Sequence, residues 1–360
     1  MPMTQRDCFQ ATVAHEPHRG VLFYASFTRD LARRVREDRG LDAGDGLAAR
    51  FGMFAPRGVR MKPPENLAKP DFSSYFADME IPEGAFIDGL GILEVPHGFY
   101  HFTQYVSPLR NARRIEELEA FPYPHVRGYT SSHMAAEVEA AHAAGRVAAL
   151  GIGHMYENAW EIRGQEPFLV DMIERPAWCE LILDRLAERN RAVAVAAAEA
   201  GCDLLTCGDD VANQRAMMFS VAQWRRFMKP RWAEVFAAAR AVKPDIEIKY
   251  HSDGNIEAVI GELIEIGVTI LNPVQPECLD PRRVKAQWGD RLVLDGTLGT
   301  QSTMPFGTPD DVRRVVRENV RTLGADGALI LAPTHVLEPE VPLENVYAFI
   351  ETAREFGEVV

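Results

Sequence analysis

Short apolar segments alternate with longer amphipathic segments along the chain after residue 145. The short segments have the lengths of β-strands, and most of them end at glycine or at a polar residue. We predict six strands, over residues 146–153, 202–210, 246–251, 268–275, 291–296 and 327–333. Short apolar strands separated by helices are typical of βα units, in which a parallel sheet is covered on both faces.

The segments between these strands have the apolar spacing of amphipathic helices. They cover residues 166–201, 220–244, 255–267, 281–289, 308–324 and 342–357. Pro176 and Pro230 lie inside the first two segments, so we expect each of these helices to be interrupted there. Glycine follows several of the predicted helices, as is common at helix C-termini.

The whole chain, residues 1–360, is predicted to be one α/β domain, a single (β/α)8 TIM barrel with an irregular N-terminal extension and insertions. Residues 131–360 supply the regular βα units, because strands so closely spaced leave no room for two separate cores. Residues 1–130 must then supply the first strands, and residues 20–27 are the best candidate for one of them.

The N-terminal part departs from the βα pattern. Residues 28–41 predict a helix, and residues 55–86 are rich in proline and predict a long irregular excursion. Residues 88–109 alternate aromatic and polar side chains, which indicates a hairpin outside the barrel. A lid over the barrel and a contact in a homodimer are the two roles that we consider for this part.

Composition narrows the class of partner. The chain is 47% hydrophobic and 25% charged, and its net charge of −13 argues against a nucleic-acid or anionic membrane surface. A small-molecule substrate is therefore expected. The N-terminus has no basic stretch followed by an apolar one, and no segment approaches the roughly 20 apolar residues of a membrane span, so we expect a cytoplasmic protein. Five cysteines without a CxxC pair indicate reduced thiols.

Polar residues follow all six predicted strands, and the active site of a parallel barrel forms at the carboxyl ends of its strands. We expect substrate contacts from His154, Glu157, Asp209, Asn213, Gln214, Asn272, Gln275, Asp295 and Gln301. His335, Asp210 and Asp253 are the candidates for catalytic acid and base, because imidazoles and carboxylates transfer protons in many enzymes.

Several of these residues have a structural alternative. Asp209 or Asp210 could cap the helix that follows, and Asp253 or Asn255 could cap the helix that starts near residue 256. For Asn255 and for Thr308, which precedes Pro309, we expect capping. For Trp160 we expect packing rather than substrate contact.

His251 and His335 each lie just beyond a predicted buried strand, where strand ends converge. Asp253 follows His251 by two residues, and Gly254 supplies the glycine that a turn needs, so the turn does not explain the imidazole. We therefore place His251 and Asp253 in a functional site. The remaining histidines are assigned no role: His15, His18, His97, His101, His125, His133 and His142.

Five segments together resemble the uroporphyrinogen decarboxylase superfamily. They are "GDDVANQ" (208–214), "HSDGNI" (251–256), "IGVTILNPVQP" (266–276), "GTPDDV" (307–312) and "LAPTHVLEPEVPLENVYAFIE" (331–351). The resemblance runs from about residue 3 to the C-terminus and is strongest after residue 145. It implies a single-domain TIM barrel, and it covers both decarboxylases and zinc-dependent methyltransferases that move a methyl group between a corrinoid protein and a thiol.

The match to the decarboxylases of this superfamily is incomplete. His335 corresponds by position to the histidine of their "GHG" motif near the C-terminus. Their arginine-rich N-terminal motif is missing, and "RFGMFAPRG" (50–58) has no aspartate where their catalytic aspartate is expected. A porphyrin with many carboxylates needs a cluster of cations, whereas Asp, Asn and Gln dominate the strand ends here. The sequence therefore argues against porphyrin decarboxylation.

The methyltransferases bind zinc through an "HxC" pair after a middle strand and a cysteine after the last strand. By that resemblance His251 is the first ligand, Asp253 stands where the cysteine would be, and His335 lies at or beside the last ligand. Imidazole and carboxylate are both ordinary zinc ligands. Cys207 and Cys278 also follow apolar strands and could each supply sulfur, although we expect both to be structural thiols.

Three functions follow in order of preference. The first is a methyltransferase that uses zinc and a corrinoid presented by a partner protein, as the resemblance implies. The second is a metal-independent decarboxylase of a small or tetrapyrrole carboxylate, in which His335 and Asp253 or Asp210 act as acid and base. The third is a binding or accessory protein without catalysis.

Overall fold

The structure is a computed structural model that describes residues 3–96 and 103–357. His97 and His101 lie outside the described residues, as does the centre of the hairpin expected over residues 88–109. Among the described residues, no helix is both long enough and apolar enough to cross a membrane.

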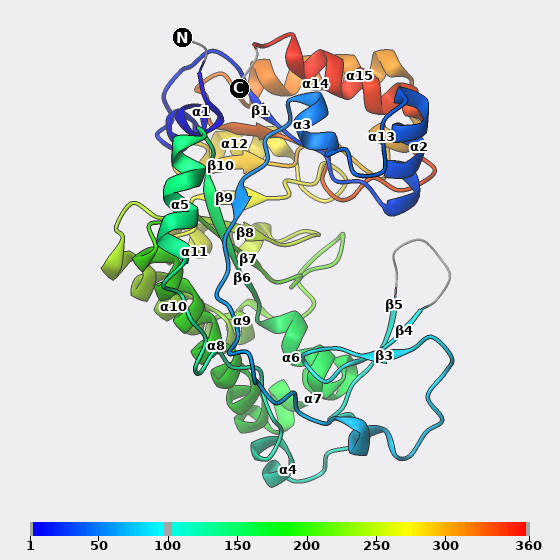
Figure 1. The fold of residues 1–360 in the computed structure, drawn as a ribbon, viewed down its shortest axis with the longest axis vertical. Helices are drawn as coiled ribbons and strands as arrows, with labels where there is room; N and C mark the ends of the chain where they lie inside the picture. The colour runs from blue at the N-terminus through cyan, green and yellow to red at the C-terminus, as the bar shows by residue number, and fades with distance from the viewer. Residues whose placement is uncertain (1–2, 97–102, 358–360) are drawn as a thin grey trace.

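Eight parallel strands form a curled sheet that is surrounded by helices, an α/β TIM-barrel fold (Figure 1). In chain order they are β1 (Leu22–Phe23), β2 (Arg57–Gly58), β6 (Ala148–His154), β7 (Leu204–Gly208), β8 (Glu247–His251), β9 (Ile270–Asn272), β10 (Val293–Asp295) and β11 (Leu329–Leu331). Their spatial order is β1-β11-β10-β9-β8-β7-β6-β2. The two edges approach each other where the Phe54 N–H donates to the Phe23 carbonyl at 2.7 Å, just before β2. All six predicted strands are confirmed, as is a strand within residues 20–27.

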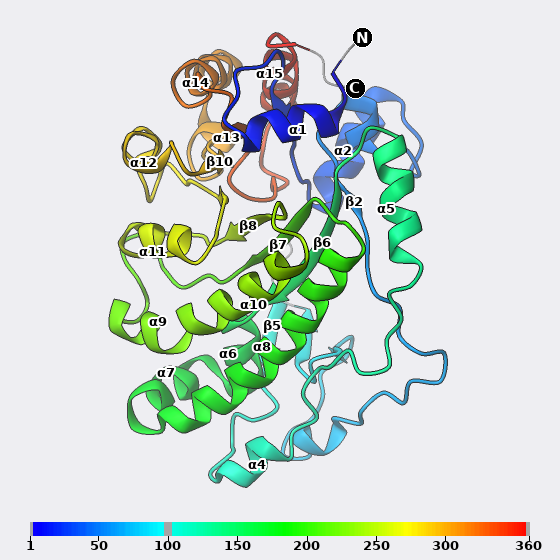
Figure 2. The same cartoon turned by 90° about the vertical axis from the view of Figure 1, so that its left-hand side faces the viewer.

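Helices cover the outside of the barrel. Their bounds are α1 (Gln5–Val13), α2 (Arg29–Arg39), α3 (Leu47–Phe51), α4 (Ile115–Glu119), α5 (Met134–Ala143), α6 (Tyr156–Arg163), α7 (Gln165–Glu174), α8 (Pro176–Glu199), α9 (Val221–Phe227), α10 (Lys229–Val242), α11 (Ile260–Glu265), α12 (Pro281–Trp288), α13 (Thr303–Phe306), α14 (Pro309–Thr322) and α15 (Leu343–Arg354). Two 3-10 turns, η1 (Ser73–Phe76) and η2 (Glu257–Val259), complete them. The long helices α8 and α10 pack side by side (Figure 2).

The predicted helix breaks and one predicted cap are confirmed. Proline begins α8 at Pro176, and Pro230 lies in the first turn of α10, where the missing N–H costs nothing. Thr308 caps α14, because its hydroxyl accepts the Asp311 N–H at 3.2 Å while the Asp311 carboxylate accepts the Thr308 N–H. Asn255 closes a turn by accepting the Glu257 N–H at 3.2 Å, so the segment starts as η2 before α11.

The strands alternate between two apolar clusters, as the period of a strand requires. One cluster joins Leu22, Ala149, Leu204, Ile270, Val293 and Ile330, from six barrel strands, to Cys8 and Phe9 of α1. The residues that alternate with them, such as Leu205, Leu271 and Leu294, belong to the larger cluster with the outer helices. The first cluster therefore fills the barrel interior at the end that α1 covers, and polar residues continue the same inner face toward the carboxyl ends of the strands.

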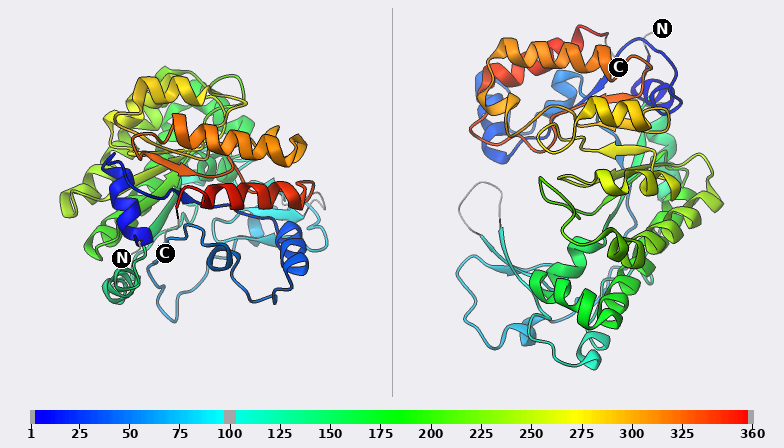
Figure 3. Two further views of the ribbon diagram at one scale, coloured as in Figure 1. Left: turned by 90° about the horizontal axis from the view of Figure 1, so that it is seen from above. Right: turned by 180° about the vertical axis from the view of Figure 1, so that it is seen from behind.

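A small antiparallel sheet lies outside the barrel. It consists of β3 (Phe86–Ile87), β4 (Leu93–Pro96) and β5 (Thr103–Val106), so the described part of the predicted hairpin is confirmed. The sheet lies beside α6 and α7, away from α14 and α15 (Figure 3). Tyr105 of β5 packs edge-on against Trp160 of α6, with ring centroids 6.1 Å apart. Trp160 thus has the packing contact that we expected.

Candidate functional site

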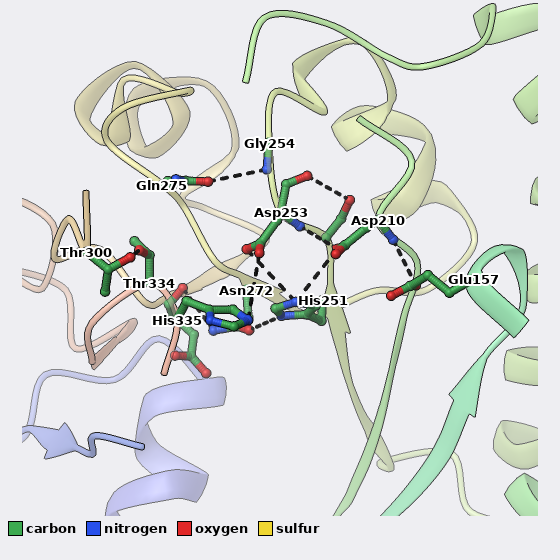
Figure 4. A network of polar contacts seen from close by, with 12 residues as sticks. Glu157, Asp210, His251, Asp253, Gly254, Asn272, Gln275, Thr300, Thr334 and His335 are labelled. Atoms are coloured by element: carbon green, nitrogen blue, oxygen red, sulfur yellow. Dashed lines mark hydrogen bonds and ion pairs between the residues drawn. The ribbon is translucent and has the colours of Figure 1, made fainter. Parts of the chain in front are cut away.

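Three sequence-predicted residues meet at the carboxyl ends of the strands (Figure 4). Nε2 of His251, at the end of β8, lies 4.0 Å from Oδ1 of Asp253. Nε2 of His335, four residues beyond β11, lies 4.0 Å from Oδ2 of the same carboxylate. The Asp253 carboxylate therefore lies between the two imidazoles, whose ring centroids are 6.4 Å apart.

Asp210 adds a second carboxylate to this group. Its Oδ1 lies 3.7 Å from Nε2 of His251 and accepts the backbone N–H of Asp253 at 2.8 Å. Burial, and next the charge of Glu157, raise the pKa of Asp210 above its ordinary value. Asp210 is thus held against the turn that carries Asp253, and it can take up a proton more readily than an exposed aspartate.

Two glycines allow the loops after β7 and β8 to come this close. Gly254 has φ +86°, and a Cβ there would lie 2.5 Å from the Asn213 carbonyl oxygen. A Cβ on Gly208 would lie 2.2 Å from the His251 carbonyl oxygen. Both contacts are with backbone, which cannot move aside cheaply. The "SDGN" turn after His251 is therefore needed to bring Asp253 back toward the imidazole.

The two nitrogens of His251 have different surroundings. Nδ1 lies 2.7 Å from Oδ1 of Asn272 on the neighbouring strand β9, and Nε2 faces the carboxylates of Asp210 and Asp253. An amide oxygen only accepts hydrogen bonds, so Nδ1 carries a proton, and in the neutral ring Nε2 therefore presents a lone pair. This contact ties His251 to the neighbouring strand and orients its other nitrogen into the site.

Among the described residues, the ligand atoms of Asp210, His251 and Asp253 lie close enough together to share a zinc ion, whereas His335 approaches only the other oxygen of Asp253. Ligand distances of about 2.0–2.2 Å in a tetrahedral site place ligand atoms roughly 3.5 Å from one another. The separations here are 3.7 Å and 4.0 Å, and the ligand atoms of Asp210, His251 and Asp253 all lie within 4.8 Å of one another. Oδ1 of Asp253 is buried without a hydrogen-bond partner, which is costly unless a cation binds it. No backbone N–H among the described residues caps this carboxylate, so the alternative of a helix cap at Asp253 is wrong.

Asp209 has a structural role, although it is adjacent to Asp210. It is fully buried, and its Oδ1 accepts the N–H groups of Met155 and Tyr156, both at 2.6 Å. Its Oδ2 accepts the indole N–H of Trp232 at 2.7 Å. Burial raises its pKa to about 7, against the pull of these donors. Both oxygens are therefore engaged at the start of α6, and the substrate contact that we expected from Asp209 has no exposed atom to make it.

His154 and Glu157 form a pair next to this group. Oε2 of Glu157 lies 2.7 Å from Nδ1 of His154 and also accepts the Asp210 N–H at 2.9 Å. Burial lowers the pKa of His154, but the Glu157 hydrogen bond and the surrounding carboxylates outweigh it and raise the pKa to about 9. Burial and the charge of Glu157 raise the pKa of Glu161 to about 8. His154 is thus a protonated group beside several carboxylates at neutral pH.

The other predicted contacts divide between the rim and the interior. At the rim, Gln214 and Gln301 are exposed and hydrogen-bonded at 2.5 Å, while Oδ1 of Asn213 accepts two N–H groups of its own turn. Gln275 accepts the Gly254 N–H at 3.4 Å. Asn272 and Asp295 are buried inside the barrel below His251.

Two residues of the site were not predicted. Lys249 lies on the inner face of β8 and forms an ion pair with Asp295 at 2.5 Å, and Tyr24 follows β1 and donates to Asp295 at 2.9 Å. Burial lowers the pKa of Lys249, but the charge of Asp295 outweighs it and raises the pKa overall. The signal in the sequence was a lysine at an inward position of "IEIKYH", two residues before His251. Cys207 is buried and Cys278 partly buried, and neither joins a described group of metal ligands.

Comparison with known proteins identifies the family of this chain. The family model for uroporphyrinogen decarboxylase (URO-D) matches residues 129–356, which is more than half of the chain. The chain therefore belongs to the uroporphyrinogen decarboxylase family. No curated protein sequence matches the chain.

Two solved structures resemble this chain to different degrees. A methyltransferase from Methanosarcina mazei superposes with a TM-score of 0.66 at 18% identity, over 98% of this chain and 99% of that one. At this identity the likeness shows the fold, over the full length of both chains. The dihydropteroate synthase of Yersinia pestis gives a TM-score of 0.33 at 18% identity, over 49% of this chain and 64% of that one. That score is too low to carry an argument.

Proposed function

We propose that this protein transfers a methyl group between a corrinoid, presented by a partner protein, and a thiol, with a zinc ion held by His251, Asp253 and His335. The observation that carries the proposal is the donor set itself: two imidazole Nε2 atoms each 4.0 Å from one of the two oxygens of Asp253, one of which is buried without a hydrogen-bond partner. The overall likeness to a methyltransferase, with a TM-score of 0.66, agrees with this choice within the family.

The site residues would have different roles in binding the zinc ion. His251, Asp253 and His335 are the three ligands, and Asp210, 3.7 Å from Nε2 of His251, lies beside them without being a ligand. A bound zinc would supply a Lewis acid that turns a thiol, with a solution pKa near about 8.5, into a nucleophilic thiolate. Asn272 holds the ring of His251 so that the lone pair of Nε2 faces the carboxylates.

The rest of the site orients the substrates. The pKa of His154, about 9, keeps its ring positively charged at neutral pH, so it can bind an anionic group of the thiol substrate. Asp210, with its raised pKa, can accept the proton that the thiol gives up. The exposed amides of Gln214 and Gln301 lie at the rim, where a corrinoid protein would dock. Asp209, from which we expected a substrate contact, has no part in this step because it is fully buried.

Zinc content tests the metal site. Protein purified without a histidine tag would be analysed by mass spectrometry for the wild type, a His251→Ala/His335→Ala variant and a His125→Ala/His133→Ala control. The control removes two histidines that do not belong to the site. We expect about one zinc per chain in the wild type and the control, and almost none in the site variant. Equal zinc in all three proteins would remove the proposed ligands.

Turnover tests the reaction. Free methylcobalamin and 2-mercaptoethanol would be mixed with each protein, and loss of the cobalt-bound methyl group would be followed by absorbance. We expect demethylation with the wild type and the control only. If no protein holds zinc and the wild type instead releases carbon dioxide from a carboxylate substrate in a reaction that needs His335 and Asp253, the metal-independent decarboxylase replaces this proposal.

A further inference from the structure

A buried polar layer lies directly beneath the metal ligands, on the inner face of the barrel. It contains Tyr24, Lys249, Asn272 and Asp295, from four different strands or strand ends. Apolar residues fill the inner face one layer further down. Burying an ion pair and two hydrogen-bonding groups in a barrel core gives up apolar packing, so this layer needs an explanation beyond stability.

We propose that Lys249, Asp295 and Tyr24 are positioning residues that fix the tautomer of His251 by fixing the orientation of the Asn272 amide. The four residues form one hydrogen-bonded chain that ends at Nδ1 of His251 (Figure 4 shows the last contact). The consequence for a metal rests on the proposed function, whereas the tautomer itself does not.

The direction of the first hydrogen bonds follows from chemistry. The ammonium group of Lys249 can only donate, and it lies 2.5 Å from Oδ2 of Asp295 and 3.0 Å from the Tyr24 oxygen. An ionised carboxylate can only accept, so at the 2.9 Å contact with Oδ1 of Asp295 the Tyr24 hydroxyl must donate. The single proton of that hydroxyl is then committed to Asp295, and the Tyr24 oxygen is left as an acceptor.

The donors and acceptors of the next hydrogen bonds follow from this arrangement. The Asn272 amide must turn its NH2 group toward the Tyr24 oxygen, at 3.2 Å, and the same group reaches the Asp295 carbonyl oxygen at 3.5 Å. Its Oδ1 then faces Nδ1 of His251 at 2.7 Å and can only accept, so the imidazole proton resides on Nδ1. In the neutral ring, Nε2 is then left with its lone pair facing the carboxylates of Asp210 and Asp253.

Without this chain the amide could turn over. An Asn272 side chain rotated by half a turn would offer NH2 to Nδ1 and place the imidazole proton on Nε2, where it would block a metal. A purely structural role for the ion pair predicts something different: loss of Tyr24 would lower stability and leave the His251 tautomer unchanged. The two explanations therefore predict different tautomers of the His251 ring when Tyr24 is replaced.

Nuclear magnetic resonance of the metal-free protein separates them. Histidine-labelled protein, treated with EDTA, would be examined by long-range proton–nitrogen spectra, which distinguish a protonated Nδ1 from a protonated Nε2. The His251 signals would be assigned from their loss in His251→Ala. Tyr24→Phe removes only the hydroxyl, and Tyr123→Phe, a buried phenol without a hydrogen-bond partner, is the matched control.

We expect His251 to carry its proton on Nδ1 in the wild type and in Tyr123→Phe, and to be a mixture of both tautomers in Tyr24→Phe. Adding Asn272→Asp to Tyr24→Phe should restore the wild-type tautomer, because a carboxylate accepts from Nδ1 whichever way it turns. An unmixed wild-type tautomer in Tyr24→Phe would overturn the inference. If Tyr24→Phe does not fold, Lys249→Met/Asp295→Leu removes both charges together and should also mix the tautomers.

Zinc titration of the same proteins keeps the two proposals distinct. We expect Tyr24→Phe to bind zinc about 10–100-fold more weakly than the wild type, as changes behind a metal ligand do. If the tautomer shifts while the wild type binds no zinc, the positioning role stands and the proposed function fails. If the wild type binds zinc and the tautomer does not respond to Tyr24, the proposed function stands and the positioning role fails.

Discussion

The imidazole rings of His251 and His335 lie 6.4 Å apart, centroid to centroid, and both face the carboxylate of Asp253. The two histidines come from β8 and from the segment after β11, and the two strands β9 and β10 lie between them in the sheet. Only the curvature of the barrel brings them to one carboxylate. Asp253 is therefore the residue of the candidate site that both histidines share.

Replacing Asp253 by Asn tests this shared role. The variant keeps the shape of the side chain but removes its charge, so the two imidazoles lose their shared anionic partner. We expect zinc affinity to fall by at least about tenfold, since even changes behind a ligand cost this much. Asp290→Asn, at an exposed position paired with Arg291, is the control and should leave zinc affinity unchanged. Calorimetric titration with zinc would measure both, and equal affinity in the two variants would contradict the assignment of Asp253.

Asp209 and Asp210 should differ in stability although they are neighbours. Asp209→Ala leaves three buried N–H donors without an acceptor, so we expect the free energy of unfolding to fall by roughly 3 kcal/mol or more. Asp210→Ala loses one backbone hydrogen bond at a half-exposed position. We therefore expect the free energy of unfolding to fall by about 1 kcal/mol, and we expect activity to fall as well. Urea unfolding of both variants measures the difference. Equal losses would show that Asp209 is not the buried acceptor described above.

Gly254 should not tolerate a side chain. Alanine there meets a positive φ of +86° and a backbone oxygen at 2.5 Å, and we expect a loss of roughly 2 kcal/mol in the free energy of unfolding together with weaker zinc binding. Gly44→Ala is the matched control, because a Cβ there has no atom within 4 Å, and it should be neutral or slightly stabilising. Thermal unfolding would compare the two. A Gly254→Ala variant as stable as Gly44→Ala would mean that the turn after His251 is not constrained.

The pair of His154 and Glu157 should make stability depend on pH. The pKa of His154 is raised to about 9 in the folded state, from an ordinary value of about 6.5. The stability that the pair contributes is therefore fully present below about pH 6.5 and is lost as the pH rises through about 9. Because the ring is part-exposed, we expect about 1 kcal/mol between wild type and His154→Gln at pH 6, and almost none at pH 10. Urea unfolding at both values measures this, with His125→Gln as the control; a difference that does not change with pH would contradict it.

Much of the candidate site could be predicted from the sequence, because the placement of its residues depends on their position relative to the end of a strand. His251, Asp253 and His335 follow apolar runs, and the carboxyl ends of parallel strands meet at one end of a barrel. The turn after His251 was visible in "SDGN", and Pro176, Pro230 and Thr308 marked helix ends through local chemistry. These features involve residues close together in the chain, so their meaning does not depend on the rest of the fold.

Contacts between distant segments could not be predicted in the same way. Asp209 and Asp210 are adjacent residues of the same type. Only the packing of α6 and Trp232 decides that Asp209 is buried while Asp210 faces the histidines. Tyr24 and Lys249 were not predicted as site residues, because their partner, Asp295, belongs to a different strand. The sequence by itself determined which residues stand at strand ends and how the chain turns there. Only the tertiary structure decided which of them share hydrogen bonds, because closing the barrel brings strands far apart in sequence to within bonding distance.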